Sequence, residues 1–346
     1  FGNGIGFKYA DGLSLQDIFD YNYASFLLEL TDDAEIGVTV GYTTEETAIV
    51  YGVEKLCLNE LLGVYEDKLE SVYSCNIPTK QGELYLKVGD NFWAMSLFIE
   101  DSTTHDKATS PRLAYMGGKA IGRFQSLLAD FDESLAEVIK GFHNIRWRFE
   151  QWDNTLAEDR VGRVETVASE IAWIETRRER MLNFWRMVEE GELPLRVTHN
   201  DTKLSNILFD KNDDVLCVID LDTVMLSTSL NDFGDAIRSY TNRGAEDDLN
   251  LENVGMDIDL FRAYTEGYLS ERKETLTQVE REWLAFSALY ITYEQVLRFL
   301  MDYIDGDRYY KIAYPTHNLV RTKAQQRLLE SMEEQYSTMQ EIVASI

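Results

Sequence analysis

Apolar and polar residues follow two different patterns along the chain, and the change falls near residue 100. Before it, short apolar runs separated by turn residues predict strands over residues 25–30, 36–40, 47–51, 84–88 and 92–99, the last two joined by the turn Gly89-Asp-Asn91. Leucines that recur with a helical period predict one helix over residues 55–71. The first hundred residues are therefore expected to form a small mixed sheet with one helix.

After residue 100 the apolar residues recur with a helical period. The predicted helices lie over residues 112–128, 134–147, 165–190, 257–269, 278–303 and 322–336. One more helix is predicted over residues 231–239, with Asn231 or Asp232 as its N-cap and Asp235 in its first turn. Together the patterns predict an α+β protein with one unit over residues 1–100 and a mainly helical unit over residues 101–346.

Two short apolar strands within the helical part each lead into a group of polar residues. The first strand ends near Val197 and is followed by His199, Asp201 and Asn206, and the second covers residues 215–219 and is followed by Asp220 and Asp222. The order of the polar residues is H-x-D-x-x-x-x-N, then a short hairpin, then I-D-x-D. The whole set is thus expected to converge where the strands end.

Phosphoryl transfer from a metal nucleotide needs such a set of groups. One carboxylate orients the attacking hydroxyl and takes its proton, while an amide and a second carboxylate hold Mg²⁺ against the phosphates. Asp201 fits the first role, and Asn206 and Asp220 fit the second. Each of these residues alone is also typical of a turn between two buried strands. The complete set at kinase spacing favours the catalytic interpretation, with His199 packing the loop.

Composition and charge narrow the class of protein. A hydrophobic content of 45% over 346 residues is ample for a folded core, and a net charge of −28 argues against binding to nucleic acid or to anionic membrane surfaces. Three cysteines without metal spacing suit a reducing cytoplasm. We expect no signal peptide, and the apolar stretch 283–300 is interrupted by Glu294, Gln295 and Arg298, so it predicts a buried helix.

Two further features leave alternatives open at this point. Arg298 sits in a buried helix, where it pairs with Glu294 four residues earlier or lines an acceptor pocket. The opening glycines, Gly2 and Gly4 among them, either let backbone N–H groups approach a phosphate or form a flexible chain end.

The motifs His199-Asn-Asp-Thr-Lys-Leu-Ser-Asn206, Val218-Ile-Asp-Leu-Asp-Thr223 and Asn231-Asp-Phe-Gly-Asp-Ala-Ile-Arg238 together resemble the N-acetylhexosamine 1-kinases. These belong to the wider aminoglycoside phosphotransferase and choline kinase superfamily. The resemblance extends back through Gly117-Gly-Lys-Ala-Ile-Gly-Arg-Phe124 and forward through Leu297-Arg-Phe-Leu-Met-Asp-Tyr303, and it covers roughly residues 71 to 330.

The resemblance implies a two-lobed, protein-kinase-like fold, with a nucleotide-binding lobe over residues 1–100 and a catalytic, acceptor-binding lobe over residues 101–346. It implies ATP- and Mg²⁺-dependent phosphorylation of the anomeric hydroxyl of N-acetylglucosamine or N-acetylgalactosamine. Asp201 would be the base, and Asn206 and Asp220 the Mg²⁺ ligands. Phe98, Ile99 and Glu100 would form the hinge that offers backbone groups to adenine, Gly2 and Gly4 a loop near the phosphates, and Arg298 a sugar contact.

The resemblance breaks down over residues 5 to about 70. The lysine that meets the phosphates is therefore open among Lys8, Lys55 and Lys87. A kinase of another small alcohol, of the aminoglycoside or choline type, and a catalytically silent kinase-like binding protein stay as alternatives. We expect a cytoplasmic monomer or weak dimer whose partners are a sugar and a nucleotide.

Overall fold

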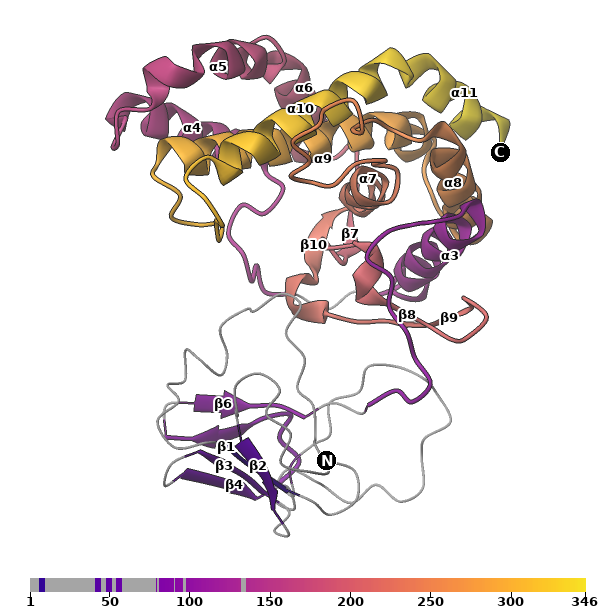
Figure 1. Ribbon diagram of the computed structural model, residues 1–346. Helices are drawn as coiled ribbons and strands as arrows, with labels where there is room; N and C mark the ends of the chain where they lie inside the picture. Colours follow the sequence, from indigo (N-terminus) through magenta and orange to yellow (C-terminus); the bar gives the residue numbers. More distant parts are fainter. Residues whose placement is uncertain are drawn as a thin grey trace. The chain divides into compact units, whose positions relative to one another are not determined.

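The computed structural model describes residues 6–9, 41–44, 48–51, 54–57, 79, 81–89, 91–95, 98–131 and 135–346. The chain divides into two compact units, Phe1–Glu100 and Asp101–Ile346 (Figure 1). Each unit is described by itself below.

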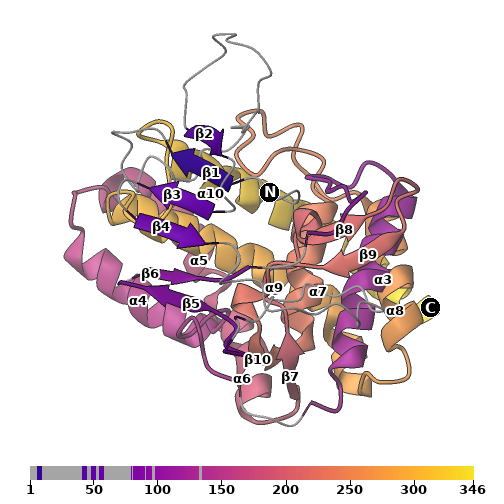
Figure 2. The same cartoon turned by 90° about the horizontal axis from the view of Figure 1, so that it is seen from below.

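The first unit contains a four-stranded sheet with the strand order β2-β1-β3-β4 (Figure 2). Strand β1 (Gly6–Tyr9) pairs antiparallel with β2 (Gly41–Thr44) and parallel with β3 (Ala48–Tyr51). Strand β4 (Glu54–Cys57) pairs antiparallel with β3. The strand expected over residues 47–51 is therefore confirmed, and the unit has the mixed sheet that the sequence predicts.

The helix predicted over residues 55–71 is wrong at its start, because Glu54–Cys57 form strand β4. Its backbone hydrogen bonds go to β3, with Leu56 opposite Ile49, and this cross-strand pairing outweighs the local leucine spacing. The later part of that prediction and the strands predicted over residues 25–30 and 36–40 fall outside the described residues.

The predicted hairpin near residue 90 is present but short. Strand β5 (Leu86–Val88) pairs antiparallel with β6 (Asn91–Trp93), and Gly89 takes a positive φ of 59° in the turn between them. The expected second strand, which was predicted to reach residue 99, ends at Trp93. The hairpin itself is confirmed.

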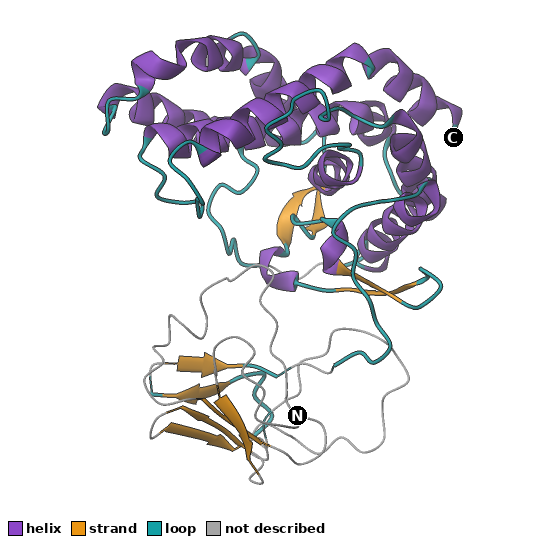
Figure 3. Ribbon diagram, in the orientation of Figure 1, coloured by secondary structure: helices purple, strands orange, loops and turns teal. Residues whose placement is uncertain are grey.

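The second unit is built mainly from helices (Figure 3). They are α3 (Pro111–Leu127), α4 (Ile145–Glu158), α5 (Ala168–Glu175), α6 (Arg178–Glu189), α7 (Ser229–Tyr240), α8 (Ile258–Arg272), α9 (Gln278–Ile304), α10 (His317–Glu334) and α11 (Tyr336–Ser345). Three short 3₁₀ turns also belong to the described part of this unit: η1 (Val164–Val167), η2 (Leu204–Asn206) and η3 (Leu221–Thr223). Helix α9 forms the centre of the core and packs against α7 and α10. No helix in the described part of the chain is long and apolar enough to cross a bilayer.

Most predicted helices are confirmed, but the single helix predicted over residues 165–190 is divided into η1, α5 and α6, and another prediction is wrong. The predicted helix over residues 134–147 is absent from its described part, where α4 begins only at Ile145. Gly141 and His143 both have left-handed backbone conformations, with φ values of 65° and 57°, which stop a helix. Asn144 then caps α4 by accepting a hydrogen bond from Trp147 N–H. Residues 141–144 are thus a turn and a cap that precede α4.

Helices α3 and α8 pack with their backbones in direct contact. A Cβ atom at Gly267 of α8 would lie 2.0 Å from the carbonyl oxygen of Tyr115, and one at Gly118 of α3 would lie 2.2 Å from that of Tyr264. Glycine on both helices therefore permits this close approach, which no other residue fits without moving the backbone.

We expect Gly267→Ala to lower the free energy of unfolding of the second unit by about 3 kcal/mol, because the added methyl must push α3 and α8 apart in a packed core. The control is Glu266→Ala, at the exposed neighbouring position of the same helix, which should change the free energy of unfolding by less than about 0.5 kcal/mol. Urea unfolding followed by circular dichroism measures both. Equal stabilities of the two variants would contradict the close contact.

Four short strands of the second unit place the polar motif. Strand β7 (Leu195–Thr198) pairs antiparallel with β10 (Met225–Thr228), and β8 (Ile207–Phe209) pairs antiparallel with β9 (Val215–Val218). The hairpin β8–β9 reverses the direction of the chain. The residues after β7 and the residues after β9 are thereby brought together, as the sequence predicts.

Candidate active site

The loop that follows β7 and the turn that follows β9 lie side by side. The backbone N–H of Ile219 donates to the carbonyl oxygen of Asn206 over 2.9 Å. This bond continues the pairing of β8 with β9 and sets Asp220 next to the end of the loop. The three predicted residues Asp201, Asn206 and Asp220 therefore belong to one small region.

Asp201 has one fixed oxygen and one open oxygen. Its Oδ2 accepts hydrogen bonds from Lys203 Nζ at 2.7 Å and from Asn206 Nδ2 at 3.1 Å. Its Oδ1 accepts no hydrogen bond from any residue that the structure describes, and the side chain is 32% exposed. The carboxylate is thus oriented by its own loop, while one oxygen stays accessible to a ligand.

Asn206 and Asp220 present oxygen donors of the kind that Mg²⁺ prefers. Asn206 is 5% exposed, and its Nδ2 group donates to both the carbonyl oxygen and Oδ2 of Asp201, which leaves Oδ1 as the unused end of the amide. The Asp220 side chain is 46% exposed. Mg²⁺ commonly takes one or two protein ligands and completes its shell with water and substrate phosphate. The pair fits that pattern.

Two other observations bear on a metal. The described part of the chain contains no group of three or more His, Cys, Asp or Glu side chains that could hold a metal ion, so protein side chains there do not form a complete coordination shell. Asp220 also has a left-handed backbone, with φ 62° and ψ 59°, a conformation that costs energy in a residue other than glycine. Such strain is found at ligand sites, where the surroundings enforce a side-chain direction.

Lys203 joins the two carboxylates and was given no role by the sequence analysis. Its Nζ lies 2.7 Å from Asp201 Oδ2 and 3.9 Å from Asp220 Oδ2. Burial on its own would lower the pKa of Lys203, but the hydrogen bond and charge of Asp201, with Asp220 beyond it, raise it above its ordinary value. A fixed positive charge therefore sits between the proposed base and the proposed metal ligand. The only signal in the sequence was its place two residues after Asp201.

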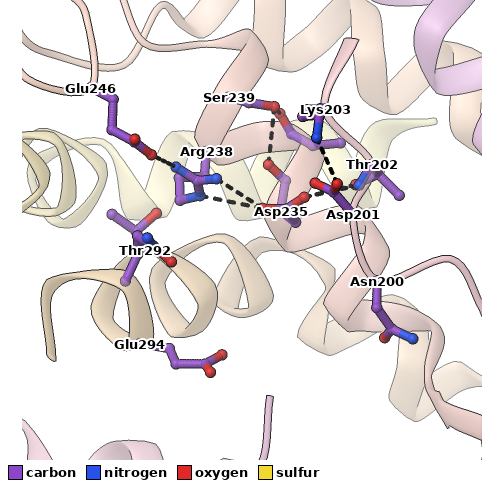
Figure 4. A network of polar contacts seen from close by, with 12 residues as sticks. Asn200, Asp201, Thr202, Lys203, Asp235, Arg238, Ser239, Glu246, Thr292 and Glu294 are labelled. Atoms are coloured by element: carbon purple, nitrogen blue, oxygen red, sulfur yellow. Dashed lines mark hydrogen bonds and ion pairs between the residues drawn. The ribbon is translucent and has the colours of Figure 1, made fainter. Parts of the chain in front are cut away.

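Helix α7 binds the loop after β7 through two carboxylates. The buried side chain of Asp232 accepts hydrogen bonds from the backbone N–H groups of His199 at 2.9 Å and Asn200 at 2.7 Å. Asp235 accepts from Thr202 N–H at 2.9 Å and is paired with Arg238 (Figure 4). Three backbone N–H groups of the loop, in residues 199, 200 and 202, are therefore bound by side chains of one helix.

This arrangement corrects the predicted role of the α7 residues. The N-cap is Thr228, whose side chain accepts from Leu230 N–H, so neither Asn231 nor Asp232 caps the helix. The helix starts two residues earlier than the predicted one, which moves Asp232 into the first turn and Asp235 beyond it. The carboxylates satisfy loop N–H groups instead of helix N–H groups.

His199 is a buried packing residue, as the sequence suggested. Its Nε2 lies 2.9 Å from the carbonyl oxygen of Ile219, and its Nδ1 accepts from Asp201 N–H at 3.3 Å. The ring meets the edge of Phe124 with centroids 5.6 Å apart. His199 thus connects the loop to the turn after β9, and neither of its ring nitrogens is free to transfer a proton.

Arg298 does not form the intrahelical ion pair that was one of its two interpretations. Glu294 pairs instead with His143 at 2.7 Å and Arg148 at 3.3 Å. The guanidinium of Arg298 lies between 5.5 and 5.7 Å from the ring centroids of Phe142, Tyr309 and Tyr310. Among the described residues its hydrogen-bond partner is Gln295, at 3.4 Å. Most of its five N–H donors are therefore free for a ligand.

The predicted nucleotide residues belong to the first unit. Gly2 and Gly4 fall outside the described residues, and Lys8 and Lys55 lie on strands of which only the backbone is described. Phe98, Ile99 and Glu100 end the first unit in irregular structure, with Phe98 exposed. Lys87 lies over the ring of Phe92, 5.2 Å from its centroid, as a surface lysine would. These residues keep the status of predictions.

Comparison with known proteins identifies the class. A sequence profile of the phosphotransferase enzyme family, APH, matches residues 94–272, which is more than half of the chain and includes the loop, the hairpin and α7. The chain therefore belongs to this phosphotransferase family.

Several solved structures are similar to this chain. An aminoglycoside phosphotransferase from Alicyclobacillus acidocaldarius is 14% identical, with 78% of this chain and 79% of that chain covered and a TM-score of 0.51. A choline kinase from Cryptosporidium parvum is 12% identical, with 73% and 74% covered and a TM-score of 0.46. Spectinomycin phosphotransferase in complex with ADP and spectinomycin is 14% identical, with 78% of each chain covered and a TM-score of 0.43. The match to the first of these confirms the predicted α+β, two-lobed kinase-like fold.

Proposed function

We propose that this phosphotransferase transfers the γ-phosphoryl group of ATP, with Mg²⁺, to the anomeric hydroxyl of an N-acetylhexosamine, N-acetylglucosamine or N-acetylgalactosamine. The observation that carries the phosphotransfer is the convergence of Asp201, Asn206 and Asp220, with Lys203 between the two carboxylates. Each group has the chemistry that one part of the reaction needs. A purely structural loop would have no use for an accessible carboxylate oxygen at Asp201.

Asp201 orients the acceptor. Its Oδ2 is held by Lys203 and Asn206, so Oδ1 is the oxygen that accepts the hydrogen bond of the sugar hydroxyl. An anomeric hydroxyl is more acidic than an ordinary alcohol, and Asp201 therefore needs only to align it and take its proton late in the transfer. Lys203 keeps the carboxylate in place and adds positive charge where the phosphoryl group passes.

Asn206 and Asp220 are the residues that would hold Mg²⁺, through the amide oxygen and the carboxylate. When bound, the ion neutralises charge that develops on the phosphates. Phe98, Ile99 and Glu100 would offer backbone groups to adenine, and Gly2 and Gly4 would approach the phosphates. These nucleotide contacts rest on the resemblance to the hexosamine kinases.

Arg298 supports a neutral, hydroxyl-rich acceptor over a cationic one. Quaternary ammonium ligands are bound in aromatic cages. Here the three rings of Phe142, Tyr309 and Tyr310 already surround a guanidinium, so a choline-like cation would meet a fixed positive charge. The free donors of Arg298 suit sugar and amide oxygens. Aminoglycosides, which are polycations, are disfavoured for the same reason.

The acceptor is tested by incubating the protein with Mg-ATP and a panel of N-acetylglucosamine, N-acetylgalactosamine, choline and an aminoglycoside. ADP release gives the rate, and ³¹P NMR of the product gives the position of the new phosphate. We expect turnover of an N-acetylhexosamine to its 1-phosphate. Turnover of choline or the aminoglycoside alone would replace the proposed acceptor, while no turnover together with no binding of Mg-ATP would favour a silent binding protein.

We expect Arg298→Gln to raise the KM of the sugar about tenfold or more and to leave the KM of Mg-ATP unchanged. A hydrogen bond from a charged donor contributes about 1.5–3 kcal/mol, and every 1.4 kcal/mol is a factor of ten. Initial rates at varied sugar and fixed ATP measure it. Arg186→Gln, on the exposed side of α6 where Arg186 pairs with Glu179, is the control and should behave as the unsubstituted protein. An unchanged sugar KM in Arg298→Gln would remove Arg298 from the acceptor site.

A further inference from the structure

The four histidines of the chain differ in what their ring nitrogens face, and the partly exposed His105 pairs through Nε2 with Asp213 at 2.9 Å. His199 has one acceptor and one donor, the carbonyl of Ile219 and the N–H of Asp201. His317 has the same combination, with Asp247 at 2.8 Å from Nε2 and the N–H of Ala313 donating to Nδ1. A neutral ring satisfies each pair, because it carries one N–H and one lone pair.

His143 is different, because both of its ring nitrogens face acceptors. Nδ1 lies 2.7 Å from Glu294 Oε2, and Nε2 lies 3.2 Å from the carbonyl oxygen of Asn200. Neither a carboxylate nor a carbonyl can donate a proton. The ion pair with Arg148 keeps Glu294 ionised, so both contacts are hydrogen bonds only when both ring nitrogens carry hydrogen, which makes His143 an imidazolium. The ring is buried, with a side chain 5% exposed, so water does not replace either partner.

The surroundings keep this charge in place. Glu294 of α9 faces His143 through Oε2, and its Oε1 pairs with Arg148 of α4. Arg298 of α9 adds positive charge that acts on Glu294, and Asp235 of α7 adds a second negative charge that acts on His143. Burial on its own would lower the pKa of His143, but Glu294 and Asp235 raise it above its ordinary value. Burial likewise opposes the charge of Glu294, yet His143 and Arg148 bring the pKa of that carboxyl down to about 2.

The group that His143 holds is the peptide that precedes Asp201. Asn200 has a left-handed backbone with φ 66°, its N–H is bound by Asp232, and its carbonyl oxygen is bound by His143. The two bonds come from opposite ends of the residue and fix the orientation of the Asn200–Asp201 peptide. A left-handed asparagine is a strained conformation that needs such support.

We propose that His143, in its doubly protonated form, is a positioning residue for phosphotransfer: it clamps the carbonyl of Asn200 to Glu294 and so sets the direction of the Asp201 carboxylate. The inference rests on the proposed function, in which Asp201 meets the acceptor. It also links the base to helix α9, which carries both Glu294 and Arg298. The Asp201 side of the site and the acceptor side thus share one buried ion cluster.

The clamp has a defined dependence on pH. A histidine whose pKa is raised on folding stabilises the fold fully below its unfolded pKa of about 6.5. This stabilisation is lost as pH rises through the higher pKa of the folded state. Glu294, whose folded pKa is near 2, contributes above its unfolded pKa and loses its contribution only in strong acid. The clamp is therefore complete in weakly acid solution and weakens as pH rises through the folded pKa of His143.

The variant His143→Gln tests the clamp, and His317→Gln is the matched control, since His317 is equally buried and also meets a carboxylate. At pH 6.5 we expect His143→Gln to lower kcat about 10²-fold with the KM of Mg-ATP within about twofold, since small misplacements of catalytic groups cost this much. The ratio of unsubstituted to variant kcat should fall toward one as pH rises above the folded pKa of His143. An unchanged kcat, or a ratio that is constant with pH, would overturn the proposal.

Two measurements do not depend on finding the acceptor. Selective ¹⁵N labelling of the four imidazoles should show, at pH 6.5, a doubly protonated ring that is missing from the spectrum of His143→Gln, and the absence of such a ring would overturn the proposal. Hydrogen exchange should be faster in residues 199–204 of His143→Gln than of His317→Gln, and equal exchange would also overturn it. If no acceptor is turned over while both results are as expected, the proposed function fails and the clamp stands.

Discussion

We expect Asp201→Asn to lower kcat by between about 10² and 10⁴-fold, the range that a positioned acid or base contributes. The amide has nearly the same shape as the carboxylate, but it neither takes the proton of the acceptor hydroxyl nor attracts Lys203, which lies 2.7 Å away. Because the side chain is 32% exposed, its replacement should leave the fold intact. Steady-state rates with the acceptor found in the panel measure the loss.

The control for this variant is Asp214→Asn. Asp214 is an exposed carboxylate that pairs with Arg112 and lies close in sequence to strand β9. It should turn over at the unsubstituted rate, and both variants should have the same melting temperature as the unsubstituted protein. If Asp201→Asn kept most of the rate, the proton would go to another group, and the assignment of Asp201 as the base would be wrong.

The second large effect should come from Asp220→Asn. Removal of one unit charge beside a divalent ion at a partly exposed position costs several kcal/mol, and we therefore expect the Mg²⁺ concentration for half-maximal rate to rise about 10²-fold. The measurement is the rate as a function of Mg²⁺ at saturating ATP. High Mg²⁺ should restore part of the rate, which distinguishes a weakened metal site from a lost fold.

Asp222→Asn is the matched control for Asp220→Asn. It lies two residues further in the same I-D-x-D segment and is exposed. Its Mg²⁺ requirement should be unchanged. A shift in both variants, or in neither, would mean that the position of Asp220 beside Asn206 is not what binds the metal.

The part of the site that the sequence predicted is the part carried by local spacing. Asp201 and Asn206 belong to one loop, and the hairpin β8–β9 returns Asp220 to that loop through the bond between Ile219 N–H and Asn206. Two short apolar strands with a tight turn between them leave few other arrangements. The convergence of these residues therefore followed from the order of residues along less than thirty positions.

The part that was missed depends on contacts between distant segments. His143 meets Asn200 and Glu294 across 57 and 151 residues, and Asp232 reaches the loop from 33 residues away. No periodicity records such pairs, and for His143 the helical pattern was misleading, since its left-handed backbone ends the helix predicted around it. Lys203 was visible two residues from Asp201, but its partner Asp220 is close only in the fold.

The fold predictions also succeeded or failed according to whether local spacing or distant contacts determine the element. Long amphipathic helices such as α3 and α9 were predicted to within a few residues, because many turns of one apolar face outweigh any single residue. Strand β4 was read as the start of a helix, because its four residues carry too short a pattern and its hydrogen-bond partner is β3. Short elements take their form from their neighbours.

Calorimetric titration of Mg-ATP into the unsubstituted protein, Asp201→Asn and Asp220→Asn tests the central claim most directly, because it separates holding the nucleotide from using it. If Asp201 serves the acceptor while Asp220 holds the metal, Asp201→Asn will bind Mg-ATP within a few-fold of the unsubstituted protein and Asp220→Asn about 10²-fold more weakly. Equal affinities in all three proteins, or the same loss in both variants, would contradict the division of roles between the two carboxylates that Lys203 joins.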